Sequence, residues 1–262
     1  MLVEATRMGQ ILRWLRRSSG LAGCLALWCV LSYGGIVSRG FLPSPTGIVE
    51  RFIELAENGY ANSTLWQHIF DSVYRTLSGF VLGVAVGTPI GLLLGYYRRF
   101  DESIGPIFSF LRPIPPIAYT PLFVLYLGIG DASKIVLIFI GAFLYMLLSA
   151  QAGVRNVPEV LVRAGKNAGL RGAGLFIKVI IPGSLPGIMT GARTALSVSW
   201  ALVVAAELIA AQAGLGYMVS NAGVFFDIRT LFVGIILIGI VGLILDRTIL
   251  MIERRLLHWQ GR

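Results

Sequence analysis

The sequence predicts an all-α polytopic membrane protein with six transmembrane helices and cytoplasmic N- and C-termini. Of its 262 residues, 56% are hydrophobic and only 13% are charged, and the mean hydropathy is +0.78. A soluble domain carries about 25% charged residues. This composition excludes an ordinary soluble enzyme, a disulfide scaffold and a disordered tail.

Six apolar stretches approach or exceed the roughly 20 residues that a helix needs to cross a bilayer. They cover residues 21–37, 77–97, 104–127, 135–154, 188–211 and 231–251. With the N-terminus inside, 14 of the 22 basic residues fall on the cytoplasmic side and 4 on the other, and this asymmetry fixes the orientation. The predicted units are a cytoplasmic segment 1–20, a transmembrane domain 21–252 and a cytoplasmic tail 253–262.

The first apolar stretch follows three arginines, and no convincing cleavage pattern follows it. We therefore expect an uncleaved first span rather than a signal peptide. Cys24 and Cys29 lie in this stretch and are expected to be small buried residues. The net charge of +9 reflects membrane topology rather than nucleic-acid binding.

Residues 46–58 predict an amphipathic helix that lies along the outer membrane surface. Its apolar positions share one face, while Glu50, Arg51 and Glu54 lie on the other. Thr46 can cap its start and Gly59 can end it. Packing of this helix over the bundle is favoured over docking of a soluble partner.

The second span carries five glycines at a spacing of four, which places them on one helix face. A face without side chains allows another helix to approach its backbone closely. These glycines are Gly79, Gly83, Gly87, Gly91 and Gly95. Pro89, in the same span, is expected to kink the helix.

The third span is interrupted by prolines. Arg112, Pro113, Pro115 and Pro116 stand almost together, and Pro121 follows, so this stretch cannot be a regular helix. One interpretation is a broken helix that lines a translocation path, with Arg112 supplying positive charge. The alternative is a proline kink in which Arg112 caps freed carbonyl groups within the bundle.

The longest cytoplasmic loop, residues 155–187, predicts two short amphipathic helices. The first begins near Pro158 and ends at Gly169, and the second is expected to end at Pro182. A compact helical surface at the inner face of the membrane suggests a docked cytoplasmic partner.

This loop resembles the coupling-loop signature of permease subunits of ABC importers that use a binding protein. That signature has Glu-Ala-Ala, then Gly three residues on, and later Ile-x-Leu-Pro. Arg163 replaces the Glu and Gly165 the second Ala, while Val179 and Ile181 replace Ile and Leu. The coupling positions implied by the resemblance are Arg163, Ala164, Gly165, Gly169, Val179, Ile181 and Pro182.

The resemblance extends over nearly the whole chain. It is similar to the nitrate, sulfonate, bicarbonate and taurine branch, and most of all to taurine permeases. The stretches that carry it are 41–45, 66–68, 112–116, 127–130, 182–186, 205–210 and 214–216.

This resemblance implies a type I ABC importer permease fold in the bacterial inner membrane. It implies a homodimer, two cytoplasmic ATP-binding subunits, and a periplasmic or lipid-anchored substrate-binding protein. The chain contains no Gly-x-x-x-x-Gly-Lys-[Ser/Thr] motif, so ATP and Mg are expected in the partner ATPase, with no cofactor and no enzymatic activity here. Taurine or a related sulfonate is the expected substrate. Nitrate, bicarbonate or another organic anion stays open, and a secondary transporter or channel is less favoured.

Glu207 is an acidic residue in the apolar fifth span, and Trp200 lies two turns before it. The resemblance places this region near the outer gate, so both residues are expected to face the pathway. Alternatively, Glu207 pairs with a basic group such as Arg75 and holds helices together. No cluster of histidine and acidic residues has metal-ligand spacing, and no nucleophile and base pair suggests an enzyme.

Overall fold

The computed structural model describes residues 20, 22–35, 37–38 and 40–258. These residues form helices joined by turns and short loops. The predicted segment 1–20 lies outside the described residues except for Gly20, and so do the last four residues of the predicted tail.

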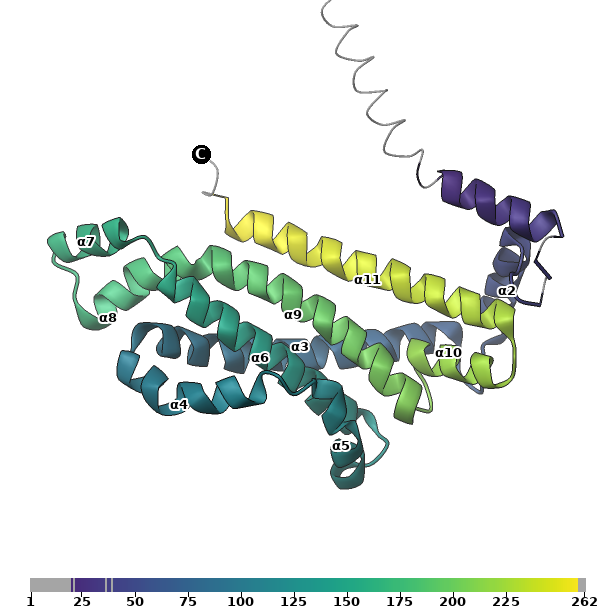
Figure 1. Ribbon diagram of the computed structural model, residues 1–262, viewed down its shortest axis with the longest axis horizontal. Coiled ribbons are helices and arrows are strands. Elements are labelled where there is room, and N and C mark those ends of the chain that lie inside the picture. The colour runs from purple at the N-terminus through teal and green to yellow at the C-terminus, as the bar shows by residue number, and fades with distance from the viewer. Residues whose placement is uncertain (1–19, 21, 36, 39, 259–262) are drawn as a thin grey trace, which may run out of the picture.

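Four helices are long and apolar enough to cross a membrane. They are α3 (Leu65–Tyr96), α6 (Asp131–Arg155), α9 (Ile181–Ala210) and α11 (Ile228–Leu256). In Figure 1, α6, α9 and α11 run side by side along the length of the molecule. They correspond to the predicted second, fourth, fifth and sixth spans, although α3 begins 12 residues earlier than the predicted 77–97.

The predicted first span is represented by a shorter apolar helix, Ala22–Tyr33. This helix lies against the start of α11, because the Trp28 ring stacks on Phe232 and its Nε1 donates to the carbonyl oxygen of Pro43 at 3.1 Å. The described part of this helix is shorter than the roughly 20 residues that a span requires. A sixth span therefore stays a prediction.

The predicted third span is two helices rather than one. The first, α4 (Arg98–Leu111), starts before the predicted stretch 104–127. It is followed by a 3-10 turn, Pro116–Tyr119, and by α5 (Thr120–Leu127), and the two arms are bent by 80°. The bend follows from the prolines between the arms, whose rings and missing N–H groups prevent continuous helical hydrogen bonding. The pair is either one broken span or a re-entrant loop, so the described residues hold four or five candidate spans.

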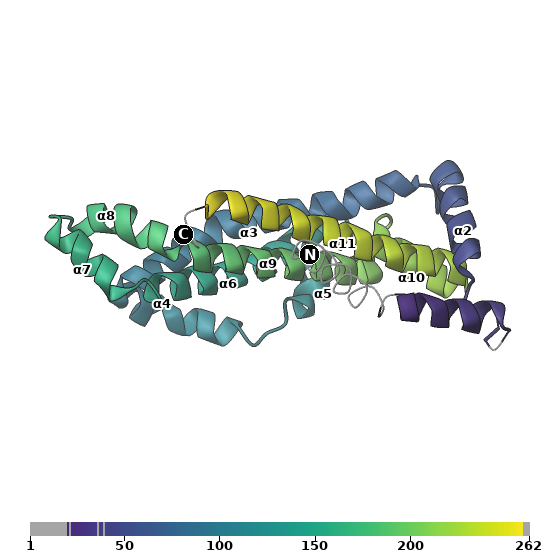
Figure 2. The same ribbon diagram turned by 90° about the horizontal axis from the view of Figure 1, so that it is seen from above.

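Helix α2 (Pro45–Asn58) lies at the opposite end of the molecule from α7 (Glu159–Asn167) and α8 (Gly172–Leu175), as Figure 2 shows. Ser44, rather than the predicted Thr46, caps it, because the Ser44 Oγ accepts a hydrogen bond from the Gly47 N–H at 3.2 Å. Gly59 ends the helix with a φ of 74°, as predicted. Such a φ is readily adopted by glycine.

Arg51 fastens α2 to the start of α11. Its guanidinium donates to Thr230 at 2.8 Å and to Asp227 at 2.9 Å. Burial alone would raise the pKa of Asp227, but hydrogen bonds from Thr230 and the charge of Arg51 outweigh it and hold that pKa below its ordinary value. The polar face of α2 therefore packs on the bundle through Arg51. The ion pair between Arg51 and Asp227 remains ionised at neutral pH.

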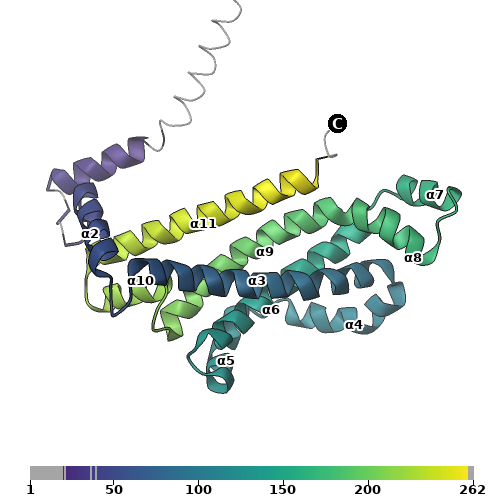
Figure 3. The ribbon, with the colours of Figure 1, turned by 180° about the vertical axis from the view of Figure 1, so that it is seen from behind.

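Helices α3 and α6 form the most extensive helix pair in the described structure, and Figure 3 shows α3 crossing in front of α6. All five glycines of the second span face α6. A Cβ atom on Gly83 would lie 2.5 Å from the Ala142 Cβ, and one on Gly87 would lie 2.7 Å from the Phe143 carbonyl oxygen. The two backbones approach each other this closely because no side chain separates them. Helix α3 continues past Pro89 to Tyr96.

The loop after α6 forms two helical arms. The first is α7 (Glu159–Asn167), and Gly169 follows it with a φ of 83°. The second arm, α8 (Gly172–Leu175), does not end at Pro182 as predicted, because the apolar helix runs on from Gly172 to Ala210. A wider π-helical turn at Phe176–Ile180 precedes Pro182. This turn changes the hydrogen-bonding pattern before the proline, so the ring and the missing N–H do not break the helix.

Candidate functional site

The broken helix borders a cavity of about 730 Å³ against α6. Arg112, Pro113 and Pro115 line it from one side, and Tyr145 and Ser149 line it from the other. The Arg112 side chain is exposed and makes no hydrogen bond or ion pair with any residue that the structure describes. The contacts of this chain therefore leave the charge of Arg112 available to the cavity, and Arg112 does not cap carbonyl groups here.

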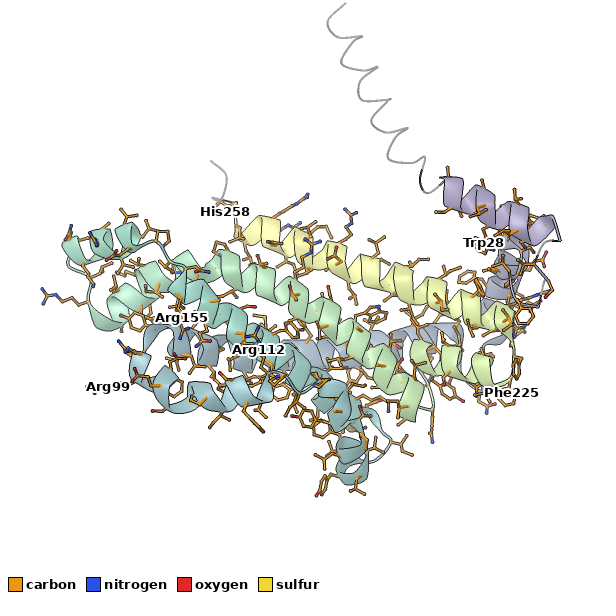
Figure 4. The ribbon with its side chains drawn as sticks, in the orientation of Figure 1. Trp28, Arg99, Arg112, Arg155, Phe225 and His258 are labelled. Atoms are coloured by element: carbon orange, nitrogen blue, oxygen red, sulfur yellow. The ribbon has the colours of Figure 1, made fainter. Side chains whose placement is uncertain are left out.

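A second cavity of about 580 Å³ continues from the first along α4. The two share Arg112, Leu148 and Gln151 as lining residues. The second cavity is also lined by Asp101 and Arg155. Together the cavities follow the groove between α6 and the two segments α4 and 112–116, and Figure 4 shows Arg112 and Arg155 along this side of the bundle.

Glu207 is buried within a separate polar cluster. Its side chain is 1% exposed. Its carboxylate accepts hydrogen bonds from Ser72 Oγ at 2.8 Å, from Arg75 Nη1 at 2.6 Å and from the Gly216 N–H at 2.9 Å. The structure therefore brings Glu207 and Arg75 together, which is the helix-bracing alternative, and Glu207 lines neither of the two cavities.

Arg75 extends this cluster to two further segments. Its Nε donates to Asp131 at the start of α6 at 2.7 Å, and its Nη1 donates to the Ala213 carbonyl oxygen at 2.8 Å. One guanidinium thus joins α3, α6, α9 and the loop after α9. We call Ser72, Arg75, Asp131 and Glu207 the Arg75 cluster. Such a buried charge is stable only with partners of this kind.

The Arg75 cluster also positions a short helix that the sequence did not predict, α10 (Leu215–Val224). The Leu215 N–H donates to Ser72 Oγ at 2.8 Å, and the Gly214 N–H donates to His68 Nδ1 at 3.0 Å. His68 Nε2 faces the Tyr60 carbonyl oxygen at 3.0 Å, so His68 is neutral with its proton on Nε2. These side chains satisfy N–H groups at the helix start, which have no partner within the helix.

Sequence reasoning missed the roles of His68, Ser72 and Asp131. A signal was present, because His68, Ser72 and Arg75 are spaced four and three residues apart and so share one face of an apolar helix. Polar residues aligned in this way within a span call for buried partners.

Trp200 does not accompany Glu207. Its indole Nε1 donates to the Ile238 carbonyl oxygen of α11 at 3.1 Å, and its ring packs where a side chain on Gly242 would stand. The side chain is 9% exposed. The structure thus places Trp200 in the α9 and α11 interface, away from both cavities.

The helical arms after α6 expose most of the residues expected to couple to a partner. Arg163 and Ala164 are exposed on α7, and Arg163 pairs with Glu159 at 2.8 Å within the same helix. Gly165 is buried, and a Cβ atom there would lie 2.9 Å from side-chain atoms of Leu175 and Val179. Gly165 and Val179, two of the positions that differ from the coupling-loop signature, therefore lie against each other where the two arms meet. Figure 1 shows these arms projecting beyond the end of the bundle.

Among the described residues, no group of three or more histidine, cysteine and acidic side chains could hold a metal ion. The arrangement consists of a membrane-spanning helical bundle, a proline-broken segment beside connected cavities, and an exposed pair of helical arms at one end. These features define the membrane subunit of a transporter.

Residues 87–258 match the family described as the binding-protein-dependent transport system inner membrane component. The chain belongs to this family. It is 42% identical over 260 residues to a probable ABC transporter permease protein of Brucella abortus, covering 99% of this chain and 100% of that one. It is 39% identical over 242 residues to the taurine transport system permease protein TauC of Escherichia coli, covering 92% of this chain and 88% of that one. The resemblance to the taurine, sulfonate and nitrate branch is thereby confirmed.

The fold is similar to that of a solved methionine ABC transporter, MetNI, in an inward-facing conformation. The TM-score is 0.66 with 20% identity, and the match covers 73% of this chain and 95% of that one. The protein is therefore a multi-pass permease subunit of the inner membrane, without ATPase activity or a bound cofactor of its own. Its family implies an ATPase and a substrate-binding protein as partners.

Proposed function

We propose that this chain forms the translocation path of an ATP-driven importer for a small anion or zwitterion, with taurine or a related sulfonate as the first candidate. The observation that carries the proposal is Arg112, whose side chain has no partner among the described residues and lies beside a cavity of about 730 Å³. An ion that leaves water without a partner loses many kcal/mol of hydration. A positive charge in the path reduces this cost for an anion. The 39% identity to a taurine permease supports the sulfonate class.

We further propose that two copies of the chain assemble with two cytoplasmic ATP-binding subunits, each permease having six spans and both termini inside. The first span would then begin in the 21–37 stretch. In this orientation α7 and Gly169 face the cytoplasm, where they would contact the ATPase, and Trp200 and Glu207 lie toward the outer half. Because the Glu207 carboxylate is hydrogen-bonded within the Arg75 cluster, we propose that Glu207 braces the outer gate region and does not touch the substrate.

Uptake into proteoliposomes tests the function. The permease, its ATPase and its substrate-binding protein are reconstituted, and radiolabelled taurine uptake is measured with all ion gradients collapsed. ATP-dependent uptake is the expected result. Competition by methanesulfonate, nitrate and bicarbonate then defines the substrate class. Uptake that follows an ion gradient and ignores ATP would instead indicate a secondary transporter or channel.

The variant Arg112→Gln is expected to assemble normally and to retain binding-protein-stimulated ATPase activity, but to take up substrate much more slowly. The reason is that the Arg112 side chain makes no hydrogen bond or ion pair with the described residues that the substitution could break, while the cavity loses its positive charge. Size-exclusion chromatography, ATPase rates and uptake rates measure the three quantities. Poor assembly would assign Arg112 a structural role, and normal uptake would remove it from the path.

The variant Gly169→Asp is expected to weaken ATPase binding and ATP-driven uptake while the bundle remains folded. Gly169 has a φ of 83° and no atom within 4 Å of an added Cβ, so the cost is backbone strain of about 1–2 kcal/mol together with a new negative charge at the turn. Gly169→Asn is the matched control, because it adds the same strain without the charge. Pull-down of the ATPase and uptake give the readouts, and wild-type values for both variants would place docking elsewhere.

A further inference from the structure

A cluster of three polar side chains lines the second cavity. The Asp101 carboxylate of α4 accepts hydrogen bonds from Gln151 Nε2 and from Arg155 Nη2, each at 2.5 Å. All three residues line the cavity that also contains Arg112. The Arg155 side chain is 54% exposed and that of Asp101 is 26% exposed, so water reaches this ion pair.

The two arginines of the connected cavities therefore differ in one respect. Arg112 has no counter-ion among the described residues, whereas Arg155 has Asp101. The other acidic residue of the lining, Glu102, pairs with Arg98 at 2.8 Å. In Figure 4, Arg155 lies between Arg112 and the end of the molecule that carries α7.

We propose that Arg155 is a second anion-binding site in the path, and that Asp101 is the carboxylate that competes with the transported anion for it. This inference rests on the proposed function, because it assigns a release site to the same path. A singly charged sulfonate presents oxygens that accept from a guanidinium as a carboxylate does. The anion replaces Asp101 on Arg155, and the return of Asp101 releases the anion toward the cytoplasm.

Because the ion pair between Arg155 and Asp101 is exposed, the free energy needed for this exchange is small. A half-exposed ion pair contributes little to stability, because water and salt screen both charges. The anion can therefore displace Asp101, while Asp101 prevents Arg155 from holding the anion permanently. The Gln151 amide group lies beside both and can donate a hydrogen bond to either carboxylate or sulfonate.

The position of Arg155 suits a release site. It is the last residue of α6, and only 156–158 separate it from α7. This connection is anchored, because Val157 is buried and lies 3.0 Å from where a Cβ atom on Gly183 would stand. Anion release would thus occur next to the segment that we propose contacts the ATPase.

The proposal predicts opposite effects for the two partners of one ion pair. Without Asp101 the anion meets no competitor on Arg155, so its affinity rises and its release slows. Without Arg155 the anion loses a donor, so its affinity falls. A pair that only braces α4 against α6 would respond in the same direction to either substitution, because both break the same contact.

The experiment uses the full permease and ATPase complex in nanodiscs, without nucleotide or binding protein, and radiolabelled methanesulfonate as the probe. Compared with the wild type, Asp101→Asn is expected to lower the Kd about fivefold and Arg155→Gln to raise it about fivefold, the fold-change of one exposed ion pair. The double variant should resemble Arg155→Gln alone.

In proteoliposomes Asp101→Asn should also reduce uptake at saturating substrate. Arg193→Gln is the matched control, since it breaks a comparably exposed ion pair between α9 and α11, Arg193 with Asp246 at 2.8 Å, whose residues line neither cavity, and its Kd should equal that of the wild type.

If the Kd for methanesulfonate shifts in the same direction in both single variants, or in neither, the inference is overturned and the ion pair is a helix brace. Absence of methanesulfonate binding by the wild type would also overturn it. ATP-dependent uptake of any small anion by the same preparation would then still support the proposed function. Failure of uptake together with failure to bind the ATPase would defeat the proposed function itself.

Discussion

Glu207→Ala is expected to lower the free energy of unfolding of the permease by about 3–5 kcal/mol, the usual cost of removing one partner of a buried ion pair. Arg75 would lose its 2.6 Å partner while its own side chain stays buried. Ser72 and the Gly216 N–H would lose their acceptor. The first turn of α10 would lose its hydrogen bond to α9 and keep those to Ser72 and His68 of α3.

Thermal unfolding in detergent, followed by tryptophan fluorescence, measures this loss. Glu207→Gln should be less destabilising, because its amide oxygen still accepts a hydrogen bond from Gly216, although the charge opposite Arg75 is lost. Glu57→Ala is the control, since Glu57 is an exposed carboxylate on α2. If Glu207→Ala melts like Glu57→Ala, the Arg75 cluster does not hold the helices together.

Gly87→Leu is expected to prevent normal packing of α3 on α6 and to reduce the yield of assembled protein severely. The first side-chain carbon would lie 2.7 Å from the Phe143 carbonyl oxygen and 3.2 Å from the Leu147 amide nitrogen. Both are backbone atoms of α6, so no change of rotamer relieves the clash. Overpacking of a core costs about 1–3 kcal/mol, and a leucine that separates two backbones should reach or exceed the upper end.

Gly239→Leu provides a matched control in α11, because a Cβ atom on Gly239 meets no atom within 4 Å. Monodispersity on size-exclusion chromatography and the melting temperature should change for Gly87→Leu and remain close to the wild type for Gly239→Leu. Equal behaviour of the two variants would mean that the glycine face does not determine packing.

Local patterns in the sequence predicted the elements whose cause is local. Hydropathy located four long helices, the cluster of prolines at 113–116 predicted the break between α4 and α5, and Gly59 predicted the end of α2. The five glycines at a spacing of four also indicated which face of α3 meets another helix.

The remaining features depend on contacts between distant residues. The sequence allowed Glu207 to face either the path or Arg75, and only the juxtaposition of α3 and α9 distinguishes the two. Helix α10 has 10 residues and little periodicity, and side chains from other helices hold its start. Pro182 was expected to end a helix, because the wider turn at Phe176–Ile180 leaves no signal in the local composition.

The glycine face of α3 has a consequence for how a permease of this kind can move. Backbone atoms in direct contact along five successive turns, with Arg75 bonded to both α6 and α9 near one end, do not slide gradually, since packed interfaces of this density shift only between discrete arrangements. We therefore expect helices α3 and α6 to move as one rigid unit during transport. A pivot is expected where the chain lacks such contacts, in the proline-rich segment 112–116 beside the cavity, and rotation of this unit about that segment would change the shape of the path.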